Sequence, residues 1–205
     1  MTSTQQDDHF PHHIAQALNN IEELKLSGQH EASISEAEKL LFDNPDCVEA
    51  LEEIADNYVS LNKFSKAEKA CERALKLNEN SYTAKYILGF IFSQKQQWKK
   101  AVEFLKSSNT IHGNNPEILR CLGWAMFNSG KRTQGIVILE RSLNLDPENS
   151  LTLCDLGICY MQMQNFDKSI KLLKQAMQLD PHNRRVKECF EAANAFRDKF
   201  MGLKK

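Results

Sequence analysis

The feature that most constrains this chain is a pattern that recurs at a constant spacing along the sequence. Leu-Gly pairs end at Gly89, Gly123 and Gly157, which are equally spaced, and Pro147 and Pro181 share that spacing. The period of about 34 residues falls within the range of about 20–50 residues that is typical of arrays in which stacked supersecondary units share a continuous core. The repeat therefore predicts a solenoid of similar stacked units.

The register of these residues divides most of the chain into five units of equal length. A polar stretch, residues 1–13, precedes them and is predicted to be a flexible N-terminal tail. A final segment, residues 184–205, follows them. The predicted units are 14–47, 48–81, 82–115, 116–149 and 150–183.

Residue size recurs at fixed positions inside the units. The eighth position holds Ala55, Gly89, Gly123 and Gly157 in units two to five, and the twentieth holds only Ser, Ala or Gly. Small residues at both positions let two helices cross closely, while mostly large residues at positions 11 and 24 fill the space beside the crossing. Ile21 stands at the eighth position of the first unit. The packing of that unit is therefore predicted to be less regular.

The apolar pattern predicts two helices in each unit. In the fifth unit Leu153, Leu156 and Tyr160 are separated by the three- and four-residue steps of the helical period. Prolines near unit ends, as in Asp146-Pro147, disfavour helix in the preceding residue and stop the second helix. The turns between paired helices are predicted at Gly28, Asn62, Gly130 and Asn165.

These recurring small and large positions resemble the tetratricopeptide repeat (TPR), whose period is about 34 residues. The resemblance covers residues 14–183. It implies an all-α fold: a right-handed α-solenoid of five TPR helix-turn-helix units. Val186, Phe190, Ala193 and Phe200 lie on roughly one face of the final segment, which is predicted to be a capping helix with a short tail. An amphipathic helix that binds a membrane surface or a partner is the alternative for this segment.

Charge is unevenly distributed along the chain. The net charge is −1, but residues 1–56 carry 13 Asp and Glu against two Lys, whereas the rest carries 24 Lys and Arg against 14 Asp and Glu. Such a layout can steer a partner or align a head-to-tail contact, and solvated helix faces are the simpler alternative. With a pI near 6.6 and no basic stripe, the sequence predicts no nucleic-acid binding.

The cysteines and histidines indicate neither a metal site nor a disulfide framework. Six cysteines are present without a C-x-x-C pair, so they are interpreted as reduced thiols that serve as small apolar residues, with a redox role for one of them as the alternative. His9, His12 and His13 fit a polar tail better than a metal site. No nucleophile-and-base motif and no phosphate-binding loop occur. The prediction is a protein without enzymatic activity, cofactor or metal.

The N-terminal stretch lacks a basic segment followed by an apolar one, as a secretory signal requires. No apolar run approaches the length of roughly 18 residues that indicates a membrane helix, so no membrane span is predicted. A cytoplasmic protein is expected.

The TPR resemblance implies that the first helix of each unit lines a concave groove, mainly through positions 2, 5, 9 and 12. Mapped onto this sequence, the groove begins acidic, becomes aromatic and ends apolar. Aromatic side chains and Arg are typical anchors of protein interfaces; packing against a neighbouring repeat is the alternative for each. The predicted groove residues are Glu22, Glu52, Asp56, Tyr86, Phe90, Arg120, Trp124, Phe127, Ile158 and Met161.

One TPR subclass binds the C-terminal carboxylate of a chaperone with a set of Lys, Asn and Arg residues. No three consecutive units supply that set here. Glu52 and Asp56 stand where its Lys and Asn would be and would repel a carboxylate. The sequence therefore argues against a co-chaperone of this kind.

Two functions are left open. The first is an adaptor or chaperone-like module that binds a protein or peptide segment, amphipathic and with basic residues, in the groove. The second is a scaffold that self-assembles as a homo-oligomer, the acidic N-terminal end of one copy meeting the basic C-terminal end of another.

Overall fold

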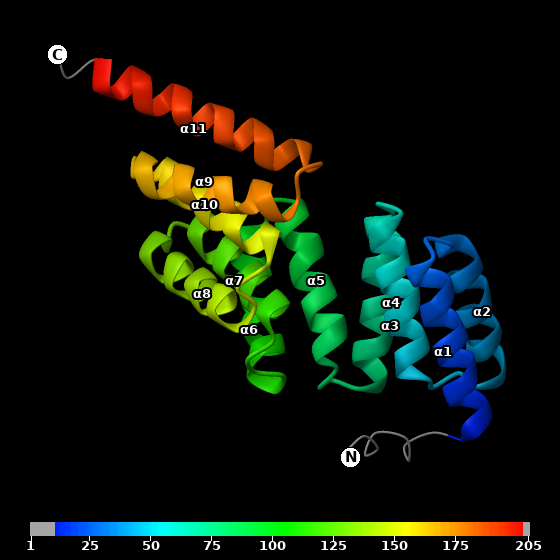
Figure 1. Cartoon of the computed structure of the whole chain (residues 1–205). Coiled ribbons are helices and arrows are strands. Elements are labelled where there is room, and N and C mark those ends of the chain that lie inside the picture. Colours follow the sequence, from blue (N-terminus) through cyan, green and yellow to red (C-terminus); the bar gives the residue numbers. More distant parts are fainter. Residues whose placement is uncertain (1–10, 203–205) are drawn as a thin grey trace, which may run out of the picture. The chain divides into compact units, whose positions relative to one another are not determined.

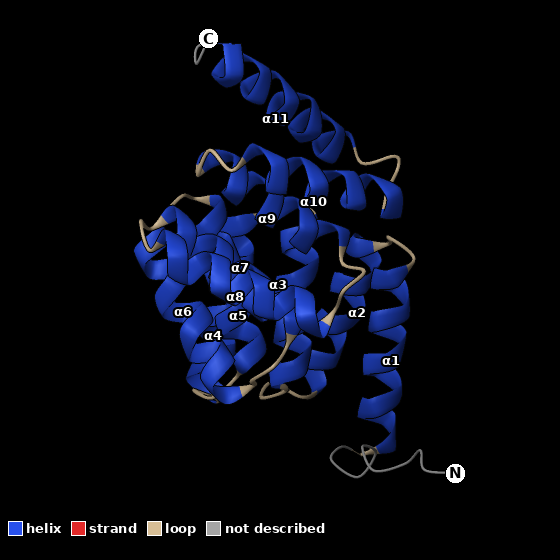
Figure 2. Cartoon of the chain, turned by 60° about the vertical axis from the view of Figure 1, so that its left-hand side comes forward, coloured by secondary structure: helices blue, strands red, loops and turns tan. Residues whose placement is uncertain are grey.

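A computed structural model of the chain describes residues 11–202, and all regular structure in that range is α-helical (Figures 1 and 2). The predicted all-α class is confirmed. Residues 1–10 of the predicted tail lie outside the described range, and the first helix begins at His12. The eleven helices in the described range are α1 His12–Leu26, α2 His30–Asp43, α3 Val48–Ser60, α4 Phe64–Leu77, α5 Tyr82–Gln94, α6 Trp98–Ile111, α7 Pro116–Asn128, α8 Arg132–Leu145, α9 Ser150–Gln162, α10 Phe166–Leu179 and α11 Arg184–Gly202.

The chain divides into two structural bodies, Met1–Lys95 and Gln96–Lys205. The N-terminal body contains α1 to α5 and the C-terminal body α6 to α11. Within each body, consecutive helices pack against each other. The first helices of neighbouring repeats are also in contact: α1 with α3, α3 with α5, and α7 with α9. The division falls inside the third predicted unit, between its two helices.

The residue that ends each of units two to five caps the helix that follows it. Ser81, Asn115, Asn149 and Asn183 occupy this last position in units two to five. Their side-chain oxygens accept hydrogen bonds from backbone N–H groups in the first turns of α5, α7, α9 and α11, at 2.9–3.3 Å. Such caps satisfy donors that the helix itself leaves unpaired.

Positions 8 and 20 meet at the helix crossings of the first, fourth and fifth repeats. A Cβ added to Gly135 would lie 2.6 Å from the carbonyl oxygen of Gly123 and 2.6 Å from the backbone nitrogen of Phe127. In the last repeat Ser169 donates a hydrogen bond to the carbonyl oxygen of Gly157 at 2.7 Å. The backbones are therefore in contact, and only the smallest side chains fit between them.

The first repeat keeps this crossing in spite of its isoleucine. Ser33 donates to the carbonyl oxygen of Ile21 at 2.8 Å, and Ile21 is completely buried. Position 24 of this repeat is Ala37, whereas the last two repeats, with glycine at position 8, carry leucine there. A large residue at one position is thus matched by a small one at the other, and the predicted irregularity of the first unit does not extend to its helix pairing.

Helix α11 lies against α10 and α9 (Figure 1). Val186 and Ala193, two of the residues predicted to face inward, are completely buried in a core cluster that also contains Leu153 and Leu173. Phe190 packs at the edge of that cluster.

We predict that Gly135→Ala destabilises the protein. Alanine normally favours a helix by about 1 kcal/mol over glycine. Here the new methyl group would meet backbone atoms at 2.6 Å, and overpacking of this kind costs about 1–3 kcal/mol. Urea unfolding followed by circular dichroism should show a lower free energy of unfolding. Gly113→Ala, whose Cβ would come no closer than 3.6 Å to Asn109, is the control; equal stability of the two variants would contradict the role of the crossing.

A second prediction concerns size matching in the first repeat. Ile21→Ala alone should leave a cavity and cost about 2–5 kcal/mol, and Ala37→Leu alone should overpack at about 1–3 kcal/mol. In the double variant the leucine fills the space that the isoleucine leaves. The two changes should therefore couple favourably by about 0.5–3 kcal/mol in a double-mutant cycle. Simple additivity would show that the two positions do not share one space.

Candidate partner-binding surfaces

The two bodies divide the predicted groove residues equally. The N-terminal body holds Glu22 on α1, Glu52 and Asp56 on α3, and Tyr86 and Phe90 on α5. The C-terminal body holds the other five, Arg120, Trp124 and Phe127 on α7 and Ile158 and Met161 on α9. Their surroundings within each body decide which of them are accessible to a partner.

The predicted acidic groove residues of the N-terminal body differ in solvent exposure and in ion pairing. Glu22 is exposed to solvent. Asp56 is paired: the ammonium group of Lys25 on α1 lies 3.2 Å from its carboxylate and 2.7 Å from that of Glu53. The side chain of Asp56 nevertheless keeps 42% of its surface exposed. Glu22 and Asp56 therefore present negative charge on this body.

Glu52 has a structural contact. Its carboxylate accepts a hydrogen bond from the hydroxyl of Ser81 at 2.5 Å, and the same hydroxyl oxygen accepts from the backbone N–H of Ala84 at 2.9 Å. Burial raises the pKa of Glu52, and the hydrogen bond from Ser81 opposes that rise. Glu52 thus joins α3 to the capped start of α5.

Helix α5 presents its two predicted aromatic anchors half-buried. Tyr86 and Phe90 are both partly accessible, whereas Ile87 and Ile91, each one position further along, are almost completely buried. The aromatic side chains thus lie at the edge of the packed face of α5.

Two of the predicted groove residues in the C-terminal body are buried in its core. Phe127 is only 2% exposed and packs with Leu139, Leu156 and Cys159. Its backbone lies against Gly135 at the helix crossing, and its side chain belongs to the core cluster between these helices. Ile158 is 8% exposed because it belongs to the cluster that α11 helps to form. Neither side chain offers appreciable surface to a partner.

Trp124 is half-buried on α7 and packs against both core clusters of this body. The guanidinium carbon of Arg185, from the first turn of α11, lies 6.0 Å from the centre of its ring. That distance is at the limit for a cation–π contact. Part of the ring therefore remains accessible beside a cation.

Arg120 is the centre of a buried charge network that the sequence did not reveal. Its guanidinium donates to Asp155 on α9 at 2.8 Å and to Glu117 on its own helix at 2.9 and 2.5 Å. Asp155 is 4% exposed, and Arg185 on α11 lies 3.6 Å from its other oxygen. Burial raises the pKa of Asp155, and the charge of Arg120 opposes that rise. The one signal of this network in the sequence is that Asp155 stands inside the mostly apolar run Leu151–Tyr160.

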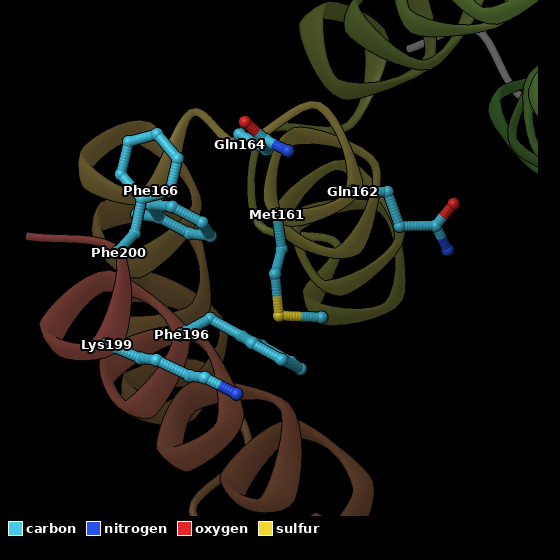
Figure 3. Close-up of a pocket in the computed structure, with 7 residues that line it drawn as sticks. All are labelled: Met161, Gln162, Gln164, Phe166, Phe196, Lys199 and Phe200. Atoms are coloured by element: carbon cyan, nitrogen blue, oxygen red, sulfur yellow. The ribbon is translucent and has the colours of Figure 1, made fainter. Parts of the chain in front are cut away.

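Met161, at the end of α9, lines an apolar hollow (Figure 3). Its other walls come from the last residue of α9, the turn that follows it, the first residue of α10 and the last turns of α11. The groove prediction included none of these residues. Sequence reasoning missed this feature because the ends of three separate helices form it. The other lining residues are Gln162, Gln164, Phe166, Phe196, Lys199 and Phe200.

All six cysteines are free, and burial raises the pKa of each thiol. Five of them are buried and Cys189 is partly accessible, which agrees with their interpretation as small apolar residues. Within residues 11–202 there is no cluster of three or more His, Cys, Asp or Glu side chains suited to a metal ion. No helix in the same range has the length and apolar character needed to cross a membrane.

We predict that Arg120→Met destabilises the C-terminal body by about 3–5 kcal/mol at pH 7, because Asp155 would remain buried without its main partner. The variant should recover stability as the pH falls, since a raised carboxyl pKa in the folded state favours folding once the group is protonated. Arg185→Met, at an exposed and longer contact, should cost less than about 1 kcal/mol. Urea unfolding at pH 7 and pH 5 checks both; equal losses in the two variants would contradict the assignment.

Comparisons with known proteins agree with this architecture. Family models described as tetratricopeptide repeat match residues 52–116 and 150–183. The BBSome complex member BBS4 of Bos taurus is 26% identical over 160 residues, and the match covers 78% of this chain but only 30% of that protein.

Among solved structures, a chain of the APC/C hetero-tetramer Cut9–Hcn1 has a TM-score of 0.82 at 19% identity, with 90% of this chain and 37% of that chain covered. YrrB, a TPR protein with an unusual peptide-binding site, has a TM-score of 0.63 at 19% identity, with 85% and 90% covered. At these identities the structural likeness shows the fold. Together, the repeat register, the paired helices and the matching family models show that this chain is a tetratricopeptide-repeat protein.

Proposed function

We propose that the protein is a non-enzymatic interaction module that holds a segment of a partner protein against the first helices of its repeats. Proteins of this family generally mediate protein–protein interactions, and the BBS4 relative is a member of a multiprotein complex. An adaptor or chaperone-like role is the form of that general property that we propose.

Trp124 is the observation that carries the proposal. It is a large aromatic residue on the first helix of a repeat, its ring is not fully used by the core, and a cation stands beside it. Trp, Tyr and Arg dominate the binding energy of protein interfaces. Tyr86 and Phe90 give the N-terminal body a comparable half-exposed pair.

The chemistry of the N-terminal body favours a partner segment that is amphipathic and carries basic residues. Glu22 and the exposed part of Asp56 can pair with Lys or Arg, while Phe90 can contact the apolar side of the segment. Phe127 and Ile158 are excluded from the proposed anchors because the core already contains them. The cytoplasmic location stays a prediction from the sequence.

The test begins with capture of the partner from native lysate by the wild-type protein, followed by affinity measurements with the purified partner. We expect Trp124→Ala to raise Kd about 30-fold, which corresponds to about 2 kcal/mol. Phe90→Ala should weaken binding in the same direction. Because Trp124 also contributes to packing, circular dichroism must show that its variant keeps its helix content.

Val137→Ala provides the matched control. Val137 is a 57% exposed apolar residue on α8, the second helix of its repeat, so its removal should leave Kd unchanged. Unchanged affinity in both Trp124→Ala and Phe90→Ala would reject the first-helix surface, and a loss in Val137→Ala alone would move the site to the second helices.

A further inference from the structure

The apolar hollow in the C-terminal body is formed by the ends of three helices (Figure 3). Met161 comes from the end of α9, Phe166 from the start of α10, and Phe196 and Phe200 from the last turns of α11. The hollow has a volume of about 410 Å³, within the range of about 300–1,000 Å³ typical of ligand pockets. Phe196 remains 53% exposed, so its ring has apolar surface left to bury.

One cation lies at this hollow. Lys199 lines it, and Figure 3 shows its side chain running along the pocket beside Phe196. The neighbouring Arg197 and Asp198 pair with each other at 3.1 Å, whereas Lys199 forms no ion pair with any residue in the range 11–202. A ligand that fits would combine an apolar side chain with an adjacent carboxylate.

The chain carries such a segment on its other body. Phe42, near the end of α2, is 86% exposed, more than any other large apolar residue in the described range, and Asp43 follows it directly. Residues 36–46 contain four carboxylates against Lys39, a net charge of −3, and Lys39 is paired with Glu36 at 2.7 Å. The segment is therefore an exposed aromatic ring in an acidic setting.

The net charges of the two bodies are also opposite, like the local charges of the acidic segment and Lys199. Residues 1–95 contain 9 Lys and Arg against 16 Asp and Glu, a net charge of −7, and residues 96–205 contain 17 against 11, a net charge of +6. Opposite fields on two surfaces steer them together and fix their orientation. The acidic body of one copy is thus attracted to the basic body of another.

We propose that the hollow is a socket for a second copy of this chain, in which the partner copy's Phe42 enters between Phe196 and Phe200 and its Asp43 pairs with Lys199. The contact joins two different surfaces, so a pair keeps one unused Phe42, on one copy, and one unused socket, on the other. Such a heterologous contact continues into a ring or a filament. It is independent of the proposed first-helix function, because it does not involve Trp124 or Phe90.

The first experiment measures the mass of the full-length protein by sedimentation across micromolar concentrations. Wild type should grow in mass with concentration. Phe42→Ser and Phe196→Ser should each weaken association at least about tenfold, since each removes one half of the contact. An equimolar mixture of the two variants should form dimers that grow no further, because only one intact Phe42 and one intact socket are present per pair.

Charge reversal tests the predicted ion pair separately. Asp43→Lys and Lys199→Glu should each weaken association, and the double variant should restore it, because the charges are exchanged and the pairing is kept. Both residues are exposed, so neither change should disturb the helix content seen by circular dichroism. Association of wild type should also weaken as salt rises.

Leu26→Ser is the matched control, since Leu26 is another highly exposed apolar residue of the N-terminal body, at 77%, and its loss should not affect the mass. A wild type that stays monomeric throughout would overturn the proposal. So would association that Phe42→Ser leaves unchanged, or a mixture of the two variants that stays monomeric.

Discussion

The close crossing of two helices, in the repeats whose helices lie within one body, is the constraint on which the rest of that body depends. At Gly135 the two backbones touch, and at Gly157 an added Cβ would lie 2.6 Å from Leu173. The helices of the first repeat cross as closely, but there the large residue is Ile21 at position 8 and the small one is Ala37 at position 24. Close packing therefore restricts the combined volume of the side chains at the crossing more than it restricts the residue at any one position.

Polar side chains on the first helices join neighbouring repeats. Glu52 and Arg120 both stand at the fifth position of their repeats. Glu52 accepts a hydrogen bond from Ser81 at the start of α5, and Arg120 donates to Asp155 on α9. Each thus contacts the first helix of the following repeat. In the sequence such residues look like free charges of a binding groove, but in the structure they stabilise the stack.

Much of the fold could be predicted because its determinants are local and repeated. The helical period, the small residues at the crossings and the apolar face of the last segment all follow from short-range spacing, and the structure shows helices at the corresponding places. The candidate site was less predictable. Trp124 and Phe90 are accessible, as an anchor must be, but Phe127 and Ile158 look equivalent in the repeat and are buried. Their burial depends on α8 and α11, whose packing the position within a repeat does not encode.

The sequence by itself determined the class of fold, the repeat register and the uneven charge, because each is a sum or a spacing of residues along the chain. Only the tertiary structure decided which inner-face residues are free, that Asp155 is held by Arg120, and that Met161, Phe166, Phe196 and Phe200 enclose a hollow. The physical reason is that accessibility and charge pairing depend on contacts between separate helices. The same residue type at the same repeat position can therefore be buried in the core, join two repeats through a polar contact, or be exposed to a partner.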